Sequence, residues 1–148
     1  MPSLSIASPV GRLTLDERDG ALVAIRWSDE AASADTPLLA EAARQLGAYF
    51  AGALDRFDLP MMPAGSPFDQ AVWAAMRAIP FGRTRSYGEL AAGLGSAPRA
   101  VGRACGRNPI PIVIPCHRVL AQGGLGGYSG AGGVATKHAL LALEGALG

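Results

Sequence analysis

The chain has 148 residues, 49% of them hydrophobic and 17% charged, with a formal net charge of +1. This composition fits an ordinary globular protein with a hydrophobic core, and no apolar run is long enough to span a bilayer. The N-terminus, Met1-Pro2-Ser3-Leu4, lacks the basic and long apolar regions of a signal peptide, so we expect a cytoplasmic protein without a membrane partner. With only Cys105 and Cys116, a disulfide framework is not expected, and a reducing compartment can keep a free thiol available for chemistry.

Charge is distributed unevenly along the chain. Residues 1–60 contain five arginines and nine acidic residues, whereas the rest contains eight basic and three acidic residues. The segment Arg77–Arg118 alone holds seven arginines and one acid. Such a segment suits a polyanionic partner such as DNA, although a solvated basic face is an equally good interpretation of charge alone.

The first 60 residues predict an antiparallel sheet followed by a helix. Apolar and polar residues alternate over three segments, Leu4–Ala7, Arg12–Arg18 and Ala21–Trp27. Between the last two, Asp19-Gly20 predicts a tight hairpin turn. A polar loop at Asp29–Asp35 precedes Thr36, the expected cap of a helix that runs to about Phe50.

Residues 55–65 have no periodicity and contain Pro60-Met61-Met62-Pro63, which indicates a linker. We therefore expect an N-terminal domain over residues 1–60 and a C-terminal domain over residues 66–148. Ser66, followed directly by a proline, is the expected cap of the first helix in the C-terminal domain.

Two short helices are predicted next. Ser86 is placed to cap a helix over Tyr87–Leu94, a break follows at Gly95–Pro98, and a second helix covers Arg99–Arg107. Two short helices joined by a glycine-containing turn predict a helix-turn-helix, and three arginines spaced four apart on the second helix strengthen this interpretation. Cys105 lies among small residues on that helix and is expected to be a buried structural thiol.

The segment Asn108–Val119 contains three prolines alternating with Ile and Val, which predicts a stiff, extended run. It ends at Cys116 and His117. A thiol beside a basic group ionises more readily than a free thiol, so Cys116 is a candidate nucleophile. From the residues alone, a buried and inert cysteine is the favoured interpretation, because free cysteines are among the most buried residues.

The C-terminal part begins with a glycine-rich segment over residues 122–133. It suits either the wall of a pocket for a flat ligand or a plain flexible connection. A last helix is predicted over Val134–Leu143, with Glu144 near its end.

Pro115-Cys116-His117-Arg118-Val119, with Asn108 eight residues before the cysteine, resembles the active-site signature of the O6-alkylguanine-DNA alkyltransferases, also called methylated-DNA–protein-cysteine methyltransferases. Further landmarks of the family occur in the same order, namely Ser86-Tyr87, Arg99-Ala100-Val101-Gly102, Gly127-Tyr128-Ser129-Gly130 and Leu143-Glu144-Gly145. The resemblance covers about Phe68 to Gly145.

The resemblance implies an α+β fold, in which a small N-terminal layer of antiparallel sheet plus helix precedes a mostly helical domain with a helix-turn-helix. It also implies DNA repair: the thiolate of Cys116 takes the alkyl group from O6-alkylguanine by SN2 displacement, irreversibly and once per molecule. The damaged base leaves the duplex first, because its O6 substituent is out of reach inside the stack. Double-stranded DNA is the expected partner of a monomeric protein without a cofactor, and acceptance of O4-alkylthymine stays open.

Roles for individual residues follow from the same resemblance. Cys116, a water, His117 and Glu144 would form a relay that removes the thiol proton, Tyr87 would donate to the leaving base, and Asn108 would brace the cysteine loop. Arg99 would fill the gap that the flipped base leaves in the stack. The expected DNA- and substrate-binding set comprises Ser86, Arg99, Ala100, Gly102, Arg107, Arg118, Val119, Tyr128 and Ser129.

Two other functions compete with this interpretation. One is a DNA-binding damage sensor that flags lesions without accepting the alkyl group, and the other is a Cys–His hydrolase of acyl groups. No metal is expected, because the N-terminal half has neither Cys nor His and the remaining set of Cys105, Cys116, His117 and His138 lacks finger-like spacing.

Overall fold

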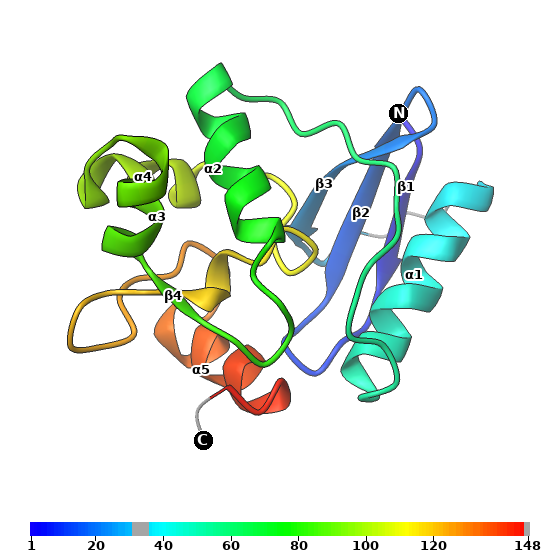
Figure 1. Cartoon of the computed structure of the whole chain (residues 1–148). Helices are drawn as coiled ribbons and strands as arrows, with labels where there is room; N and C mark the ends of the chain where they lie inside the picture. Colours follow the sequence, from blue (N-terminus) through cyan, green and yellow to red (C-terminus); the bar gives the residue numbers. More distant parts are fainter. Residues whose placement is uncertain (31–35, 147–148) are drawn as a thin grey trace. The chain divides into compact units, whose positions relative to one another are not determined.

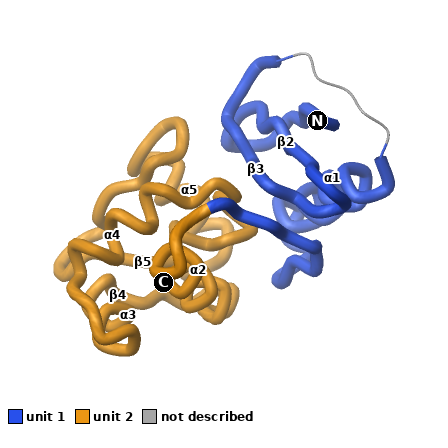
Figure 2. The backbone as a smooth tube through the Cα atoms, turned by 90° about the horizontal axis from the view of Figure 1, so that it is seen from above, with its two compact units in different colours: residues 1–64 blue, residues 65–148 orange. Residues whose placement is uncertain are grey.

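The computed structural model describes residues 1–30 and 36–146. They form two compact units, Met1–Ala64 and Gly65–Gly148 (Figure 2). An antiparallel sheet with one helix makes up the first unit and the second is mostly helical, so the predicted α+β fold is confirmed. Most of the polar loop expected at Asp29–Asp35 lies outside the described residues.

Unit 1 is a three-stranded antiparallel sheet in the order β1-β2-β3, with helix α1 against it (Figure 1). The elements are β1 (Ser3–Ile6), β2 (Leu13–Arg18), β3 (Ala21–Trp27) and α1 (Pro37–Phe50). The hairpin predicted at Asp19-Gly20 is confirmed, since both residues have the positive φ that such a two-residue turn requires (51° and 75°). Thr36 caps α1 as predicted, because its Oγ1 accepts a hydrogen bond from the Leu39 amide.

Part of the segment predicted as a linker is hydrogen-bonded to the rest of unit 1. The Leu22 amide donates to the Pro60 carbonyl and the Met62 amide donates to the Leu22 carbonyl, both at 2.9 Å, so this segment runs along β3. The Gln45 side chain of α1 also bonds both backbone groups of Asp58. Part of the predicted linker is therefore hydrogen-bonded within the unit.

Unit 2 contains the remaining helices, α2 (Pro67–Arg77), α3 (Tyr87–Leu94), α4 (Pro98–Gly106) and α5 (Val134–Leu143). Ser66 and Ser86 cap α2 and α3, each in a reciprocal capping box with an acidic residue three positions later. Gly95, with φ at 63°, ends α3 in the left-handed conformation, and α4 starts two residues after Ser96. The two helices contact each other as a helix-turn-helix, as predicted.

The expectation of an extended run over Asn108–Val119 was wrong. The chain folds back on itself, with the Ile114 amide donating to the Ile110 carbonyl at 2.9 Å and Ile112 at a φ of 75°. A 3-10 helix, η1 (Cys116–Arg118), follows, and then β5 (Val119–Leu120), which pairs in parallel with β4 (Arg85–Ser86). Prolines are excluded from the interior of an α-helix but permit turns, and the turn buries all three isoleucines of the segment.

Along the described residues, none of the helices combines the length and the apolar character needed to cross a membrane.

Candidate active site

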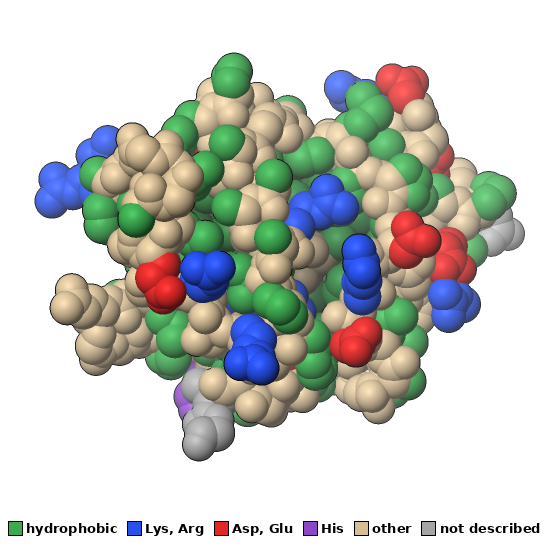
Figure 3. Space-filling view, viewed as in Figure 1, with side chains coloured by type: hydrophobic (Ala, Val, Ile, Leu, Met, Phe, Trp, Pro, Cys, Tyr) green, Lys and Arg blue, Asp and Glu red, His purple; other side chains and the backbone are tan. Residues whose placement is uncertain are grey.

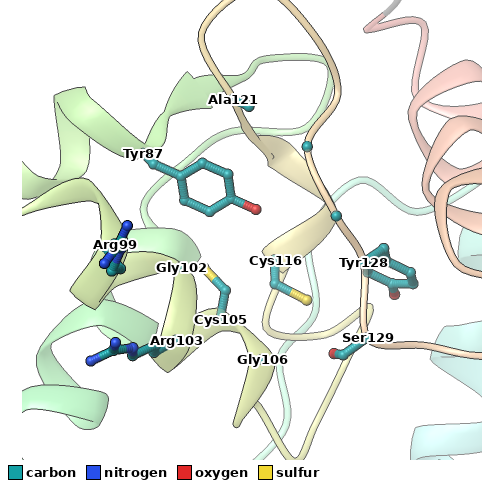
Figure 4. A pocket seen from close by; sticks show the side chains of 12 residues that line it. Tyr87, Arg99, Gly102, Arg103, Cys105, Gly106, Cys116, Ala121, Tyr128 and Ser129 are labelled. Atoms are coloured by element: carbon teal, nitrogen blue, oxygen red, sulfur yellow. The ribbon is translucent and has the colours of Figure 1, made fainter.

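A cavity of about 630 Å³ opens within unit 2 between the helix-turn-helix, η1 and the glycine-rich segment (Figure 4). Its lining comprises Tyr87, Arg99, Gly102, Arg103, Cys105, Gly106, Cys116, Ala121, Gly126, Gly127, Tyr128 and Ser129. Residues predicted separately from the helix-turn-helix and from the cysteine motif therefore share one pocket. Eight of the expected site residues do not belong to this lining, namely Ser86, Ala100, Arg107, Asn108, His117, Arg118, Val119 and Glu144.

Cys116 is buried at the wall of the cavity, with 5% of its surface exposed. Burial raises the pKa of its thiol, while a hydrogen bond with the Asn108 side chain and the charge of Lys137 act in the opposite direction. The Asn108 amide also donates to the Ile114 carbonyl at 2.8 Å, and its oxygen accepts from the Ile110 amide at 3.0 Å. Asn108 thus holds the cysteine loop from both sides. Because the pKa of Cys116 is raised overall, the resting side chain is the protonated thiol. A base must remove this proton before the sulfur can accept an alkyl group.

His117 is fully buried next to this thiol in η1. Its Nε2 lies 2.6 Å from Glu144 Oε2, and its Nδ1 has no hydrogen-bond partner among the described residues. Burial lowers the pKa of His117 despite the carboxylate, which favours the neutral ring. Because a carboxylate only accepts, we assign the proton to Nε2, which leaves the Nδ1 lone pair available as a base.

Glu144 is the C-cap residue of α5 and is 5% exposed. Besides His117, it accepts hydrogen bonds from Arg118 Nε at 2.8 Å and Nη2 at 3.1 Å. Arg118 is itself 6% exposed, and its Nη1 donates to the Ile79 carbonyl at 2.8 Å. The expectation that Arg118 binds DNA is therefore not supported, because its guanidinium is buried and committed to Glu144.

Lys137 is a site residue that the sequence reasoning missed. Its side chain is fully buried on α5, and Nζ donates to the carbonyls of Val119 at 2.7 Å and Gly127 at 3.1 Å. It thereby ties the strand after the cysteine to the glycine-rich wall, and its charge favours the Cys116 thiolate. One signal was present in the sequence: Lys137 is the single lysine beside twelve arginines.

Tyrosines close two sides of the cavity. Figure 4 shows the ring of Tyr87 reaching from α3 toward the side where Cys116 and Tyr128 lie. Burial raises the pKa of Tyr87 to about 12, so its hydroxyl keeps its proton and can donate it. A Cβ on Gly126, whose φ is 74°, would lie 3.1 Å from the Tyr87 ring, so a glycine is needed for the wall to approach this closely. Ser129 lines the same wall.

The arginines of α4 divide into two kinds. Arg99 and Arg103 are exposed at the cavity, and Figure 4 shows both extending away from Cys116. Arg107, one turn further on, pairs with Asp69 of α2 at 2.6 Å. The predicted stripe of three arginines thus presents two cations, while the third holds α4 against α2.

Four further predicted residues have mainly structural surroundings. The Ser86 hydroxyl is the cap of α3, Gly102 leaves open space beside α4, and the buried Val119 offers its carbonyl to Lys137. Cys105 is buried as predicted and contacts Met76 sulfur at 3.4 Å, yet it also lines the cavity. Burial raises the pKa of the Cys105 thiol to about 12, so it is far less reactive than a catalytic thiol.

The fold and the site define a class of protein: a small α+β unit followed by a helical unit, in which a helix-turn-helix borders a pocket built around one cysteine. Two family models match the chain. One, described as 6-O-methylguanine DNA methyltransferase, DNA binding domain, covers residues 67–146, and the other, the ribonuclease-like domain of the same family, covers residues 4–63. The chain belongs to the 6-O-methylguanine DNA methyltransferase family.

Individual relatives agree with this assignment. A methylated-DNA–protein-cysteine methyltransferase of Mycolicibacterium paratuberculosis is 48% identical, over 95% of this chain and 90% of the relative. The constitutive methylated-DNA–protein-cysteine methyltransferase of Bacillus subtilis is 42% identical over 83% of each chain. Among solved structures, Mycobacterium tuberculosis OGT in complex with DNA is similar with a TM-score of 0.88 and 44% identity, covering 98% of this chain and 93% of that one.

Proposed function

We propose that this chain is a DNA repair protein that transfers the alkyl group of O6-alkylguanine in DNA to its own Cys116. One observation carries the proposal: the buried Cys116 thiol lines the same cavity as Tyr87 and Arg99 of the helix-turn-helix. The family assignment and the DNA complex of a 44% identical relative support DNA as the partner.

The first step activates the thiol. His117 Nδ1 receives the Cys116 proton through one water, and the resulting imidazolium keeps its Nε2 proton, which stays hydrogen-bonded to the Glu144 carboxylate. The carboxylate stabilises this imidazolium, and the Lys137 ammonium stabilises the thiolate. Charge separation inside the buried site is thus balanced by groups already in place.

The second step is the displacement. The thiolate attacks the carbon bonded to O6, a carbon–sulfur bond forms, and the carbon–oxygen bond breaks with its electron pair on guanine. The Tyr87 hydroxyl donates to the departing base, because its raised pKa keeps it protonated at neutral pH. The alkylated Cys116 is a thioether, which water does not hydrolyse at neutral pH, so each molecule acts once.

Recognition of DNA completes the proposal. The damaged base is extruded from the duplex into the cavity, and Arg99, exposed at its edge, occupies the gap in the stack. Small residues beside it on α4, Ala100 and Gly102, allow a close approach to the minor groove. The protein acts as a monomer in the cytoplasm, where the Cys116 thiol stays reduced.

Intact mass spectrometry tests this function. The protein is mixed with excess duplex that carries one O6-methylguanine, beside a Cys116→Ser control. We expect one methyl adduct per protein, located on Cys116 and absent from the control. Tight binding without an adduct would indicate a damage sensor instead, and turnover of an ester substrate would indicate a hydrolase.

A further inference from the structure

The burial of Arg118 requires an explanation. A guanidinium removed from water is costly unless it is paired and fully hydrogen-bonded. Arg118 is 6% exposed, and all of its bonds are internal: Nε and Nη2 to Glu144 and Nη1 to the Ile79 carbonyl. Its guanidinium carbon also lies 5.9 Å from the centre of the Phe81 ring. With so little of its surface exposed, this side chain offers almost no surface to a phosphate.

The bonds to Glu144 have a particular geometry. Arg118 Nε approaches Oε1 and Nη2 approaches Oε2, so the guanidinium grips both carboxylate oxygens as a fork. The same Oε2 accepts the His117 Nε2–H at 2.6 Å. The fork therefore fixes the orientation of the carboxylate that in turn orients the imidazole.

We propose that Arg118 is a positioning residue of the alkyl-transfer site, which acts through Glu144 to keep His117 neutral, with Nδ1 unprotonated and directed to receive the Cys116 proton. This inference rests on the proposed function. It replaces the DNA contact expected for Arg118, and it explains why a cation is buried beside the base of the relay.

The charges around His117 support this role. Arg118 in η1 and Lys137 in α5 act on the ring through their charges, and Glu144, the C-cap residue of α5, acts through its charge and a hydrogen bond. α2 also contacts η1, but its Asp69 pairs with Arg107 and its Arg77 is exposed. After burial, which lowers the pKa of His117, Glu144 raises it and the two cations lower it. Arg118 therefore holds the Glu144 carboxylate in place while it counteracts the effect of this carboxylate on the pKa of His117.

Replacement of Arg118 by methionine should remove both the charge and the fork. Glu144 would then be paired with His117 alone, and the imidazolium would be favoured. An imidazolium carries protons on both nitrogens, so Nδ1 could not accept the thiol proton until the pH rose above the new pKa. We expect the rate of alkyl transfer at neutral pH to fall about tenfold and the rising limb of its pH profile to move up by about one pH unit.

The chain offers a direct readout, because it contains only two histidines, His117 and the exposed His138. Histidine labelled with ¹⁵N allows both rings to be titrated by NMR, and His138→Gln assigns the signals. In Arg118→Met the midpoint of His117 should rise by about one pH unit while that of His138 stays unchanged. In Arg118→Lys, which keeps the charge but loses the fork, His117 should titrate between the wild type and Arg118→Met.

Arg26→Met is the matched control, because Arg26 grips the buried carboxylate of Asp16 with the same fork, at 2.7 and 3.1 Å, in unit 1. Because the Arg26 side chain is 41% exposed, this variant should lose less stability than Arg118→Met, and it should not move His117. An unchanged His117 titration in folded Arg118→Met would overturn the proposal, whether or not the wild type accepts an alkyl group. If Arg118→Met does not fold, Arg118→Lys carries the test, and a wild-type midpoint and rate in that variant would overturn the proposal equally.

Discussion

The reactivity of Cys116 depends on opposing influences from its neighbours. Burial raises the pKa of the thiol, whereas the Asn108 side chain and the Lys137 ammonium lower it. Lys137 reaches this position because the carbonyls of Val119 and Gly127 hold its amine inside the unit. The Asn108 side chain and the Lys137 ammonium thus partly offset the rise in the Cys116 pKa that burial causes.

Lys137→Met should therefore make the thiol harder to ionise. The thiolate fraction rises with pH through the pKa of Cys116, so loss of the cation should move the pH profile of Cys116 alkylation to higher pH. A profile that lies one pH unit higher corresponds to a rate about tenfold lower at neutral pH. Iodoacetamide labelling followed by peptide mass spectrometry measures this profile. The exposed neighbour variant His138→Gln should behave as the wild type, and an unchanged profile in Lys137→Met would remove the electrostatic role of the lysine.

Asn108→Ala should loosen the cysteine loop. The substitution removes the bonds to the Ile114 carbonyl and the Ile110 amide, and it leaves both backbone groups without these partners. We expect a loss of about 1–3 kcal/mol in the free energy of unfolding, measured by urea denaturation. Asn108→Asp keeps the acceptor for Ile110 and should lose less. Equal losses in both variants would show that the acceptor for the Ile110 amide contributes nothing and that the lost amide donor accounts for the whole effect.

At the scale of elements, α4 is held in place by α2. The Trp73 Nε1–H donates to the Ala104 carbonyl at 2.9 Å, and Arg107 pairs with the buried Asp69. Asp69 also closes the capping box of α2 with Ser66. One carboxylate therefore joins the start of α2 to the end of the helix proposed to enter DNA.

The stability contributed by Asp69 should depend on pH in a defined direction. The Arg107 guanidinium holds the pKa of Asp69 below its ordinary value. A carboxylate with a lowered folded-state pKa stabilises the protein fully above its unfolded pKa of about 3.9, and this contribution is lost as the pH falls through the folded pKa. Asp69→Asn should thus be less stable by about 1–2 kcal/mol at pH 7, as for loss of a cap and an ion pair. Thermal unfolding from pH 7 to pH 3 should show this gap closing below about pH 4, and a constant gap would contradict it.

The two kinds of arginine on α4 should respond differently to salt. Arg103 has no ion-pair partner among the described residues, whereas Arg107 is paired. If Arg103 neutralises one phosphate, Arg103→Gln should lower the slope of log Kd against log salt by about one. Arg107→Gln, on the same helix, should leave the slope nearly unchanged and lower stability instead. Fluorescence anisotropy on undamaged duplex distinguishes these outcomes.

Most elements could be predicted from the sequence because their ends carry local signals. Thr36, Ser66 and Ser86 cap helices as predicted, and α5 has the predicted bounds. The cysteine loop could not be predicted in this way, since prolines exclude helix without specifying which turn replaces it. Nor does any local pattern reveal that Arg118 meets a carboxylate 26 positions away, or that the polar Lys137 lies on the buried face of α5.

For the molecule as a whole, the net charge conceals how few cations are available. All three acids of unit 2 are paired with arginines, namely Asp69 with Arg107, Glu89 with Arg85 and Glu144 with Arg118. Within the described part of this unit, four exposed arginines remain without an ion-pair partner: Arg77, Arg83, Arg99 and Arg103. On the face shown in Figure 3, the Lys and Arg side chains lie at several separate places.

This count limits the salt dependence of DNA binding. Each neutralised phosphate contributes about −0.9 to the slope of the log binding constant against log salt. Four arginines that each neutralise one phosphate therefore give a slope no steeper than about −3.6. Titrations of undamaged duplex between about 50 and 200 mM salt measure this slope. A much steeper slope would mean that further arginines take part in binding, either Arg85 and Arg107, which are paired but half exposed, or those of unit 1.

The pairing of three arginines of unit 2 with acidic residues also affects how long the protein stays on undamaged DNA. A protein that neutralises few phosphates leaves undamaged DNA quickly, so it can visit many sites in the time a more basic protein spends on one. Lesions are rare against this background, and the lifetime of each encounter determines how much of a genome one molecule inspects. The pairing of Arg107 with Asp69 would then set the speed of the search as well as the position of a helix.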